Sequence, residues 1–433
     1  MTRPTACQRL EQALARIDDP KGEGARACLT IYRDAAKAAA EASDKRGKLG
    51  ISLGPLDGAL VTIKDLFDVA GEVTRAGSKL LAAHGTPAAQ DAPVVQRLRQ
   101  AGAVIVGKTN MTEFAFSGIG ANPHFGTPGN PADRKRAPGG STAGGAVAVA
   151  DGMCEIAIGS DTGGSCRTPA AFCGIVGYKP SRQRIPTDGA FPLSFTLDSI
   201  GPMATSVENC EKADAVMAGE TYAARELAPL SALRVGVVQG LALDKLEESV
   251  ARAFEAALKR LSAAGARLID CTLPEIEDMV EVNTRYGGIA PAEAFAVHRE
   301  RLKAHGDMVD PNVRKRIERA ASLSAADYIE MIRRRNALVR AVDARLADFD
   351  VVAMPTSPVV APVLAELAQP EEWGRRNGMT LRNTSMWNFF DACSLSLPLP
   401  RDGGLPVGLM LSARNGEDAR LFRIAAGAER VLA

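Results

Sequence analysis

The sequence predicts a single α/β domain built on a large mixed sheet. Its 433 residues are 46% hydrophobic, which is enough to fill a sizeable core. Short apolar runs alternate with segments of helical spacing along most of the chain. No internal repeat, low-complexity linker or clear boundary divides it. Residues 1–433 are therefore expected to form one domain, with a helical insertion at about 275–345.

The N-terminal part predicts helices first and then alternating strands and helices. Apolar residues recur at helical spacing from residue 7 to about 45, with an interruption at 20–24. This spacing predicts two amphipathic helices, the second including Leu29, Ile31 and Tyr32. The remaining elements of this part are strands at 58–63 and 103–106 and a helix at 93–100.

The rest of the chain supplies seven more predicted strands and four helical regions. Glycine and proline crowd between residues 118 and 145, where we expect a long ordered loop region. The strands are expected at residues 155–158, 175–178, 233–238, 267–271, 349–354, 394–399 and 407–412. Helices are expected at residues 146–150, 247–264, about 290–347 and 417–432. The arginines at 333–335 are interpreted as a solvated helix face.

Charge and composition argue against a nucleic-acid or membrane role. Lys and Arg total 52 against 51 Asp and Glu, so the net charge of +1 produces no overall field that attracts polyanions. Aromatic residues make up only 5% of the chain. The first seven residues lack the features of a secretory signal, and no run of eighteen apolar residues occurs. We expect a cytoplasmic protein with no direct nucleic-acid contact and no membrane span.

Cysteine and histidine usage argues against a disulfide framework and a metal cage. The eight cysteines are scattered without a C-x-x-C pair, and the chain has only four histidines. Disulfide scaffolds and zinc sites need denser, regularly spaced cysteines or histidines. We therefore predict no metal site.

One segment matches the letters of a phosphate-binding loop. It reads Gly102-Ala-Val-Ile-Val-Gly107-Lys108-Thr109. Its four central residues are typical of a buried strand and poorly suited to a curved loop. We interpret it as a core strand that ends in Gly107. The alternative is a nucleotide-binding module using Gly102 to Thr109, in which ATP would raise the melting temperature.

Two glycine-rich segments each contain a serine. Ser165 follows Gly163 and Gly164, and such glycines leave backbone amides uncovered, as an oxyanion hole requires. Ser141 follows Gly140 in the second segment, where glycines permit unusual backbone geometry. Taken alone, the Ser165 segment is equally well explained as an ordinary glycine-rich turn, and the Ser141 segment indicates only a loop.

Lys64 closes a predicted buried strand. Desolvation there would favour the neutral amine, which can act as a base, although lysines at strand ends are usually solvated. No histidine lies in a recognisable nucleophile setting, and no G-x-S-x-G elbow is present. A serine hydrolase of this sequence would therefore use lysine. Cys166 and Cys173 are rival nucleophiles without an obvious base, and we interpret both as buried packing residues.

Together these segments resemble the amidase signature family, serine hydrolases with a Ser–cisSer–Lys triad. The resemblance spans nearly the whole chain in order and spacing. It is carried by Val61-Thr-Ile-Lys64-Asp65, Val106-Gly-Lys-Thr-Asn-Met-Thr-Glu-Phe-Ala115, Pro138-Gly-Gly-Ser141, Gly159-Ser-Asp-Thr-Gly-Gly-Ser165-Cys-Arg167, Gly174-Ile-Val-Gly-Tyr-Lys-Pro180, Leu197-Asp-Ser-Ile-Gly-Pro202, Met354-Pro-Thr-Ser-Pro358 and Leu405-Pro-Val-Gly408.

The resemblance implies the fold and a role for each site residue. The mixed sheet should be covered by helices on both faces. Ser165 becomes the nucleophile, Ser141 the bridging serine after a cis peptide bond, and Lys64 the general base. The oxyanion hole falls on the backbone amides of Thr162, Gly163, Gly164 and Ser165. Asp161 and Arg167 are expected to hold this loop by hydrogen bonding. No metal or organic cofactor is implied.

The resemblance implies hydrolysis of a small-molecule amide, carboxylic or urea-type, through an acyl-enzyme. The alternative is the glutamine amidase (A-type) subunit of a tRNA-dependent amidotransferase complex. We leave open whether the chain acts alone, as a homodimer or with a small partner subunit. The physiological substrate and its binding residues are not legible from the sequence. Aromatic residues that could line a pocket are Phe116, Phe125, Phe191, Phe195, Tyr286 and Trp387.

Overall fold

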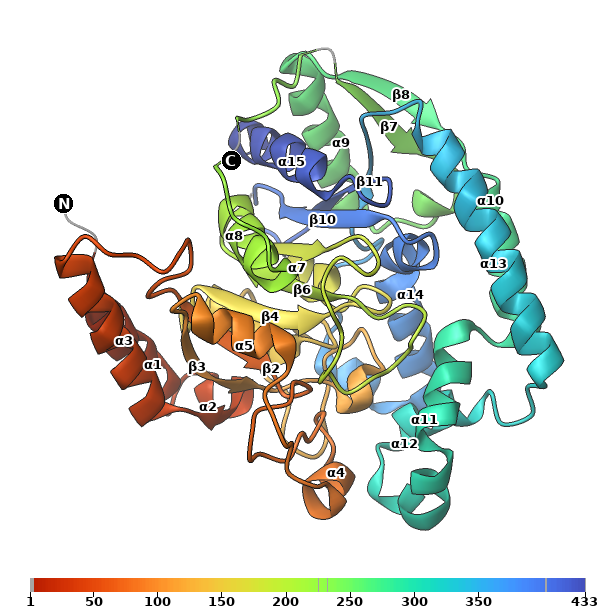
Figure 1. The fold of residues 1–433 in the computed structure, drawn as a ribbon. Coiled ribbons are helices and arrows are strands. Elements are labelled where there is room, and N and C mark those ends of the chain that lie inside the picture. Colours follow the sequence, from red (N-terminus) through yellow and green to blue (C-terminus); the bar gives the residue numbers. More distant parts are fainter. Residues whose placement is uncertain (1–3, 225, 232, 402, 433) are drawn as a thin grey trace.

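A single twisted sheet runs through the middle of the molecule (Figure 1). The computed structural model describes residues 4–224, 226–231, 233–401 and 403–432. These residues form an 11-stranded sheet in the order β1-β3-β2-β4-β6-β5-β10-β11-β9-β7-β8. Strand β2 is parallel to β3 and β4, and β7 is parallel to β8 and β9, whereas the central pairs are antiparallel. The predicted mixed sheet is therefore confirmed.

The strands are short and mostly buried. Their bounds are β1 Cys28–Ile31, β2 Leu60–Lys64, β3 Val104–Thr109, β4 Ile156–Ser160, β5 Val176–Lys179, β6 Ile200–Ala204, β7 Arg234–Val238, β8 Arg267–Cys271, β9 Val351–Pro355, β10 Cys393–Pro398 and β11 Gly408–Ala413. Every predicted strand is present, with ends within three residues of the prediction. Strands β1 and β6 are additional to the predicted set.

The helices pack on both faces of the sheet, as the resemblance implies. Their bounds are α1 Ala6–Ile17, α2 Gly24–Ala27, α3 Arg33–Lys48, α4 Lys79–His84, α5 Pro93–Gln100, α6 Ala143–Ala150, α7 Arg167–Cys173, α8 Val207–Ala218, α9 Glu248–Ala263, α10 Glu275–Tyr286, α11 Ile289–His305, α12 Pro311–Glu318, α13 Ala325–Leu346, α14 Pro370–Phe389 and α15 Asp418–Leu432. Short 3-10 helices lie at Glu113–Ala115, Gly240–Ala242, Gly306–Met308 and Leu364–Ala368.

Three hydrophobic clusters fill the layers between helices and sheet. Helices α5, α8, α9 and α15 contribute to the largest cluster. The opposite layer contains a cluster under α1, α3 and α6 and another under α10, α13 and α14. Between β8 and β9 the chain is helical, and α10 and α13 run side by side along one flank (Figure 1). That this segment is an insertion stays a prediction.

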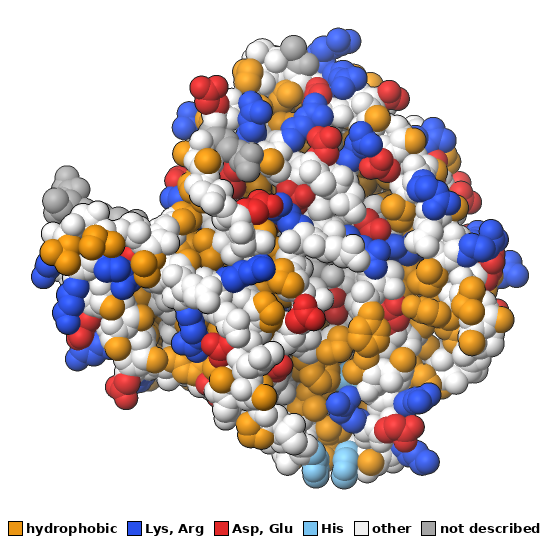
Figure 2. Space-filling view, viewed as in Figure 1, with side chains coloured by type: hydrophobic (Ala, Val, Ile, Leu, Met, Phe, Trp, Pro, Cys, Tyr) orange, Lys and Arg blue, Asp and Glu red, His pale blue; other side chains and the backbone are white. Residues whose placement is uncertain are grey.

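The surface carries charges of both signs. Figure 2 shows Lys and Arg side chains interspersed with Asp and Glu over the visible face, in keeping with the net charge of +1. None of the described helices is both long enough and apolar enough to cross a membrane.

The second predicted N-terminal helix begins later than expected. Leu29 and Ile31 lie in β1, which pairs antiparallel with β3, and helix α3 starts only at Arg33. The predicted helix over Leu29, Ile31 and Tyr32 is therefore wrong. Apolar spacing over four residues cannot distinguish a helix from a strand, and pairing with β3 decided the outcome.

The segment that matches a phosphate loop is a buried strand. Strand β3 continues through Gly107 to Thr109, and its Lys108 is 1% exposed and lies 3.2 Å from the carboxylate of Glu72. Its backbone groups pair with β1 and β2, so they cannot wrap a phosphate. The strand interpretation is confirmed, although the strand ends at Thr109 and not at Gly107.

Candidate active site

Strand order brings Lys64 and Ser160 together at one edge of the sheet. Strands β2 and β4 are parallel neighbours, so their carboxyl ends lie side by side. Lys64 ends β2, Ser160 ends β4, and Lys64 Nζ donates to Ser160 Oγ over 2.9 Å. The lysine is completely buried, so this hydroxyl replaces part of its lost hydration.

A second hydroxyl contacts the same amine. Lys64 Nζ also donates to Ser141 Oγ over 2.7 Å. Ser141 lies just before α6, a helix of alanine, glycine and valine whose Gly144 packs so closely that a Cβ atom would lie 2.3 Å from the carbonyl oxygen of Ala27. The small residues let α6 approach the sheet closely. The peptide bond between Gly140 and Ser141 is cis, as the resemblance implies.

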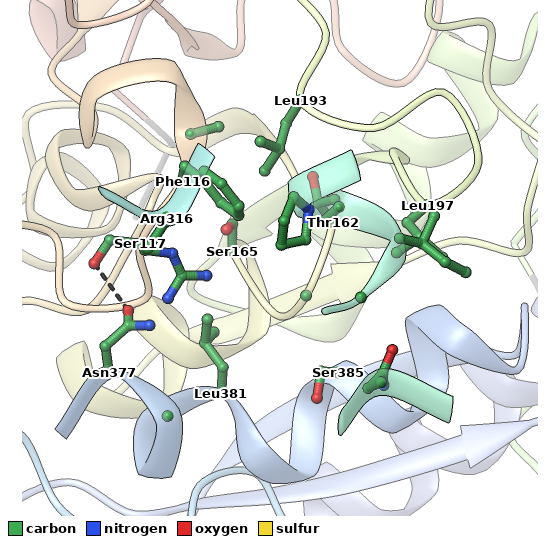
Figure 3. Close-up of a pocket in the computed structure, with 18 of the residues that line it drawn as sticks. Phe116, Ser117, Thr162, Ser165, Leu193, Leu197, Arg316, Asn377, Leu381 and Ser385 are labelled. Carbon is green, nitrogen blue, oxygen red and sulfur yellow. Dashed lines mark hydrogen bonds between the residues drawn. The ribbon is translucent and has the colours of Figure 1, made fainter. Parts of the chain in front are cut away.

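Ser165 lies in the loop that follows β4. The backbone N–H of Thr142 donates to the carbonyl of Ser165 over 3.3 Å, which joins the two serine segments. Ser165 is 4% exposed and lines a cavity, into which its side chain points (Figure 3). The structure thus brings Lys64 and Ser141 into direct contact and places Ser165 in the adjoining segment.

Asp161 organises the loop between β4 and Ser165. Its carboxylate accepts hydrogen bonds from the amides of Gly164 (2.8 Å) and Cys166 (3.1 Å) and from the Arg167 guanidinium (2.9 Å). Asn388 on α14 donates to it as well, over 2.8 Å. Burial alone would raise the pKa of Asp161, but Arg167 and these donors hold it well below its ordinary value. The expected role of Asp161 and Arg167 in holding the loop is confirmed.

The loop leaves three backbone amides without an acceptor. The Gly164 amide already has an acceptor, because it donates to Asp161 Oδ1. Within the described residues, the amides of Thr162, Gly163 and Ser165 have no hydrogen-bond acceptor. Thr384 on α14 donates to the Gly163 carbonyl over 2.7 Å and fixes the loop from the other side. These three amides, in the segment that carries Ser165, therefore remain available as hydrogen-bond donors.

Burial adjusts the basicity of Lys64. It lowers the pKa of the amine from 10.5 to about 8, while the negative charges of Asp198 and Asp161 oppose the shift. Desolvation likewise raises the pKa of Asp198 to about 6, and Asp198 accepts a hydrogen bond from the Thr162 hydroxyl over 2.5 Å. Lys64 can therefore lose and regain a proton close to neutral pH.

The rival cysteine nucleophiles are buried, as interpreted from the sequence. Burial raises the pKa of Cys166 to about 12, and its thiol donates to the carbonyl of Gly201 over 3.4 Å. Cys173 is likewise buried, and its thiol donates to the carbonyl of Pro138 over 3.3 Å. Since the thiolate is the reactive form, neither residue is an activated nucleophile.

A cavity of about 310 Å³ opens onto Ser165 (Figure 3). Its walls combine the Ser165 loop, the segment around Phe116, the start of α11, helix α12 and helix α14. Apolar lining side chains include Phe116, Leu193, Leu197, Ile289, Leu381 and Phe389. Phe116 is the one lining residue among the six aromatic candidates named from the sequence; Trp387 is fully buried in the core. The volume suits a small organic molecule.

Sequence reasoning missed several residues of the site. Ser160 lies inside the glycine-rich motif, two residues after the predicted strand at 155–158, and this position could have indicated a side chain at the end of a strand. Helix α14 is absent from the predicted elements, although Pro370 followed by Glu371 and Glu372 is a typical helix start. It contributes Asn377, whose side-chain oxygen accepts hydrogen bonds from Ser117 Oγ and the Gly118 amide.

Comparison with known proteins assigns the family. A family model described as Amidase matches residues 9–422. The chain belongs to the amidase signature family. This amidase is 37% identical over 406 residues to the 2-amino-5-chloromuconic acid deaminase of Comamonas testosteroni, an alignment that covers 92% of this chain and 86% of the relative.

Alignments with two further relatives extend over almost the whole chain. The A subunit of the glutamyl-tRNA(Gln) amidotransferase of Chloroflexus aurantiacus is 35% identical over 464 residues, covering 99% of this chain and 93% of the relative. A crystal structure of an amidase superposes with a TM-score of 0.89 at 34% identity, covering 100% of this chain and 97% of that one. The protein is an amidase signature amidohydrolase, a hydrolase that acts on C–N bonds.

Proposed function

We propose that this amidase hydrolyses a small carboxylic or urea-type amide through an acyl-enzyme on Ser165. The observation that carries the proposal is the 2.7 Å hydrogen bond between Lys64 Nζ and Ser141 Oγ, in the segment joined to Ser165. A buried lysine with a lowered pKa, a bridging hydroxyl and a serine facing a cavity are the parts that a Ser–Ser–Lys mechanism requires.

In this mechanism the proton moves along the two serines. Neutral Lys64 accepts the proton of Ser141 as Ser141 accepts that of Ser165, and Ser165 Oγ attacks the amide carbon. The oxyanion is bound by the free amides of Thr162, Gly163 and Ser165. The proton then returns through Ser141 to the departing amine, and the C–N bond breaks. Water hydrolyses the resulting ester by the same relay.

The proposed oxyanion hole has one donor fewer than the family resemblance implies. The resemblance also placed the Gly164 amide there, but that N–H donates to Asp161 Oδ1. We propose that Gly164 shapes the loop instead. Its φ of +132° and its close packing against Thr384 let the chain turn between Gly163 and Ser165. Ser160 is assigned as a positioning residue that holds Lys64 toward Ser141.

The second candidate is a glutamine amidase that works inside a complex and releases ammonia for a partner. The 35% identity to the A subunit of an amidotransferase over 99% of the chain favours it. Such a protein would show poor activity alone and would form a stable complex. We propose the self-sufficient amidase as the first hypothesis, because the cavity, the amides and the hydroxyls come from this chain alone.

Eight free thiols are compatible with a cytoplasmic location.

The test is ammonia and amine release from a panel of amides, glutamine included, by the purified chain alone. Substituting Ser165→Ala should lower turnover by at least about 10⁴-fold and abolish the acyl-enzyme detected by mass spectrometry. Cys166→Ala is the matched control and should retain turnover, since its thiol is buried and protonated. Acylation that persists in Ser165→Ala would contradict the assignment. No turnover across the panel would favour the partner-dependent glutamine amidase.

A further inference from the structure

The cavity at Ser165 contains two cations and no carboxylate. Among its lining residues Arg316 and Arg319 are charged, and none is an aspartate or glutamate. Both lie on or next to α12, three positions apart, and so share one face of that segment. Figure 3 shows the Arg316 guanidinium projecting into the cavity between Phe116 and Leu381, close to Ser165. A site with this charge favours a negatively charged ligand.

Arg316 has no protein counterion. Within the described residues it makes neither a hydrogen bond nor an ion pair, and its Nε is a buried donor without an acceptor. Burial, with help from the Arg319 charge, lowers the pKa of Arg316 to about 10, which still leaves it charged at neutral pH. Arg316 is only partly exposed, and an unpaired charge with reduced access to water is unfavourable, so an anion that enters the cavity would recover part of this free energy.

The surrounding residues orient the guanidinium but leave its donors free. Its central carbon lies 4.4 Å from the centre of the Phe116 ring, in a cation–π contact. Such a contact occupies the face of the guanidinium and leaves the N–H groups along its edge available. Those groups form a planar fork that matches the two oxygens of a carboxylate.

Helix α12 is fixed to the catalytic core by Glu113. The buried Glu113 carboxylate accepts hydrogen bonds from the Asp310 amide at the start of α12 (2.6 Å) and from Ser78 Oγ (2.6 Å), and lies 3.0 Å from His124 Nε2. Glu113 is three residues before Phe116. The same carboxylate thus fixes the helix that carries Arg316 and the segment that carries its aromatic partner. The cation is preorganised before any ligand arrives.

We propose that the substrate of this amidase carries a carboxylate that Arg316 binds while Ser165 attacks the amide group. The inference rests on the proposed function and specifies its substrate class as small monoamides of dicarboxylic acids. The apolar side chains of Leu193, Leu197 and Leu381 suit the carbon chain between the two groups. Arg319, on the exposed side of the cavity, attracts the anion toward it. Arg316 is a specificity-determining residue.

Binding measured without turnover tests this inference independently of the mechanism. The inactive Ser165→Ala chain is titrated by calorimetry with succinamate and glutaramate, and with the neutral diamides succinamide and glutaramide. Each diamide has the shape of its monoamide but lacks the charge. We expect at least one monoamide to bind about tenfold to hundredfold more tightly than its diamide, the range for a charge-assisted bidentate contact.

Two further substitutions in the Ser165→Ala background locate the effect. Arg316→Gln should abolish the preference for the monoamide, whereas Arg316→Lys should retain part of it. Lys315→Gln is the matched control, because it removes one charge from the same helix at a position outside the cavity. Arg316→Gln should not lower the melting temperature, since it removes an unpaired, partly buried charge, and Arg316→Met serves as a second neutral variant.

The outcomes separate the two proposals. The carboxylate site is wrong if neither monoamide binds more tightly than its diamide, or if the preference survives in both Arg316→Gln and Arg316→Met. A preference that depends on Arg316 supports the site even if the parent chain releases no ammonia, in which case the proposed hydrolysis alone would fail. Equal loss of binding in Lys315→Gln would show that general charge, not Arg316, governs affinity and would overturn the assignment.

Discussion

At the scale of single residues, burial decides how Lys64 behaves. The amine lies at the end of β2 with no exposed surface, and its hydrogen-bond partners are the hydroxyls of Ser141 and Ser160. Neutral hydroxyls stabilise an ammonium ion less than a carboxylate would, so burial prevails and the pKa falls to about 8. A carboxylate in place of either serine would keep the lysine protonated and unable to act as a base.

The pH dependence of turnover tests this role. Because the protonated amine cannot accept a proton, kcat/KM should fall as pH drops below about 8 and should approach a tenfold decrease for each further pH unit. Lys64→Met should remove this acidic limb together with nearly all turnover. Lys179 is a matched control: it is also buried with its pKa lowered to about 8, but its amine donates to the Pro180 carbonyl. In Lys179→Met, kcat/KM should still fall at acidic pH as in the parent protein. If the Lys179 substitution removed or shifted this fall, the assignment to Lys64 would be wrong.

At the scale of elements, the turn after β4 is the feature that forms the site. Asp161, fixed by Arg167 and by Asn388 of α14, accepts the amides of Gly164 and Cys166. The turn needs glycine at position 164, where φ is +132° and a Cβ atom would lie 2.1 Å from Thr384 Oγ1. A Cβ atom added at Gly163 would lie 3.9 Å from its nearest neighbour. Position 163 therefore has room for a Cβ atom, whereas position 164 does not.

Alanine substitutions at the two glycines should separate these effects. Gly164→Ala adds backbone strain and a clash with Thr384, so we expect the free energy of unfolding to fall by about 2 kcal/mol or more. Turnover should fall with it as the Ser165 loop shifts. Gly163→Ala should cost less than about 1 kcal/mol, because the added methyl group makes only an ordinary contact, 3.9 Å from Ser385. Chemical denaturation and ammonia release measure both variants; equal destabilisation would contradict this account of the turn.

Longer elements show how tertiary contacts override local patterns. The interpretation of the arginines at 333–335 as a solvated helix face holds for Arg333, which is exposed. Arg335, however, is 1% exposed and forms an ion pair with Asp391, so that part of the interpretation is wrong. Helix α13 packs against neighbouring helices, and Arg335 lies on its buried side. A run of like charges does not reveal which of its members faces inward.

At the scale of the whole molecule, the cavity depends on segments far apart in the sequence. Phe116, Arg316 and Leu381 meet around Ser165 because strand crossovers place their segments at the same edge of the sheet. The overall charge is close to zero, so any attraction for an anionic substrate comes from the local arginines. Salt screens the attraction between such local charges and a substrate, so varying the ionic strength tests whether the arginines attract the substrate.

Ionic strength should affect charged and neutral substrates differently. For a monoamide such as succinamate, kcat/KM should fall severalfold between about 0.01 and 0.15 M salt, as screening weakens the attraction to Arg319 and Arg316. For succinamide it should change little. Arg319→Gln should flatten the dependence for succinamate without altering kcat, since Arg319 lies at the exposed edge of the cavity. A parallel salt response for both substrates would count against electrostatic attraction.

The sequence by itself determined the α/β class, most strands and the segments that carry the chemistry. It could do so because buried strands and glycine-rich turns are local patterns, and because Lys64, Ser141 and Ser165 each lie within one. Only the tertiary structure decided that Lys64 contacts Ser160, that the Gly164 amide is used by Asp161, and that Arg316 faces the same cavity as Ser165. These contacts join residues between 3 and 151 positions apart in the chain. Strand order and helix packing set such distances, and no local pattern encodes them.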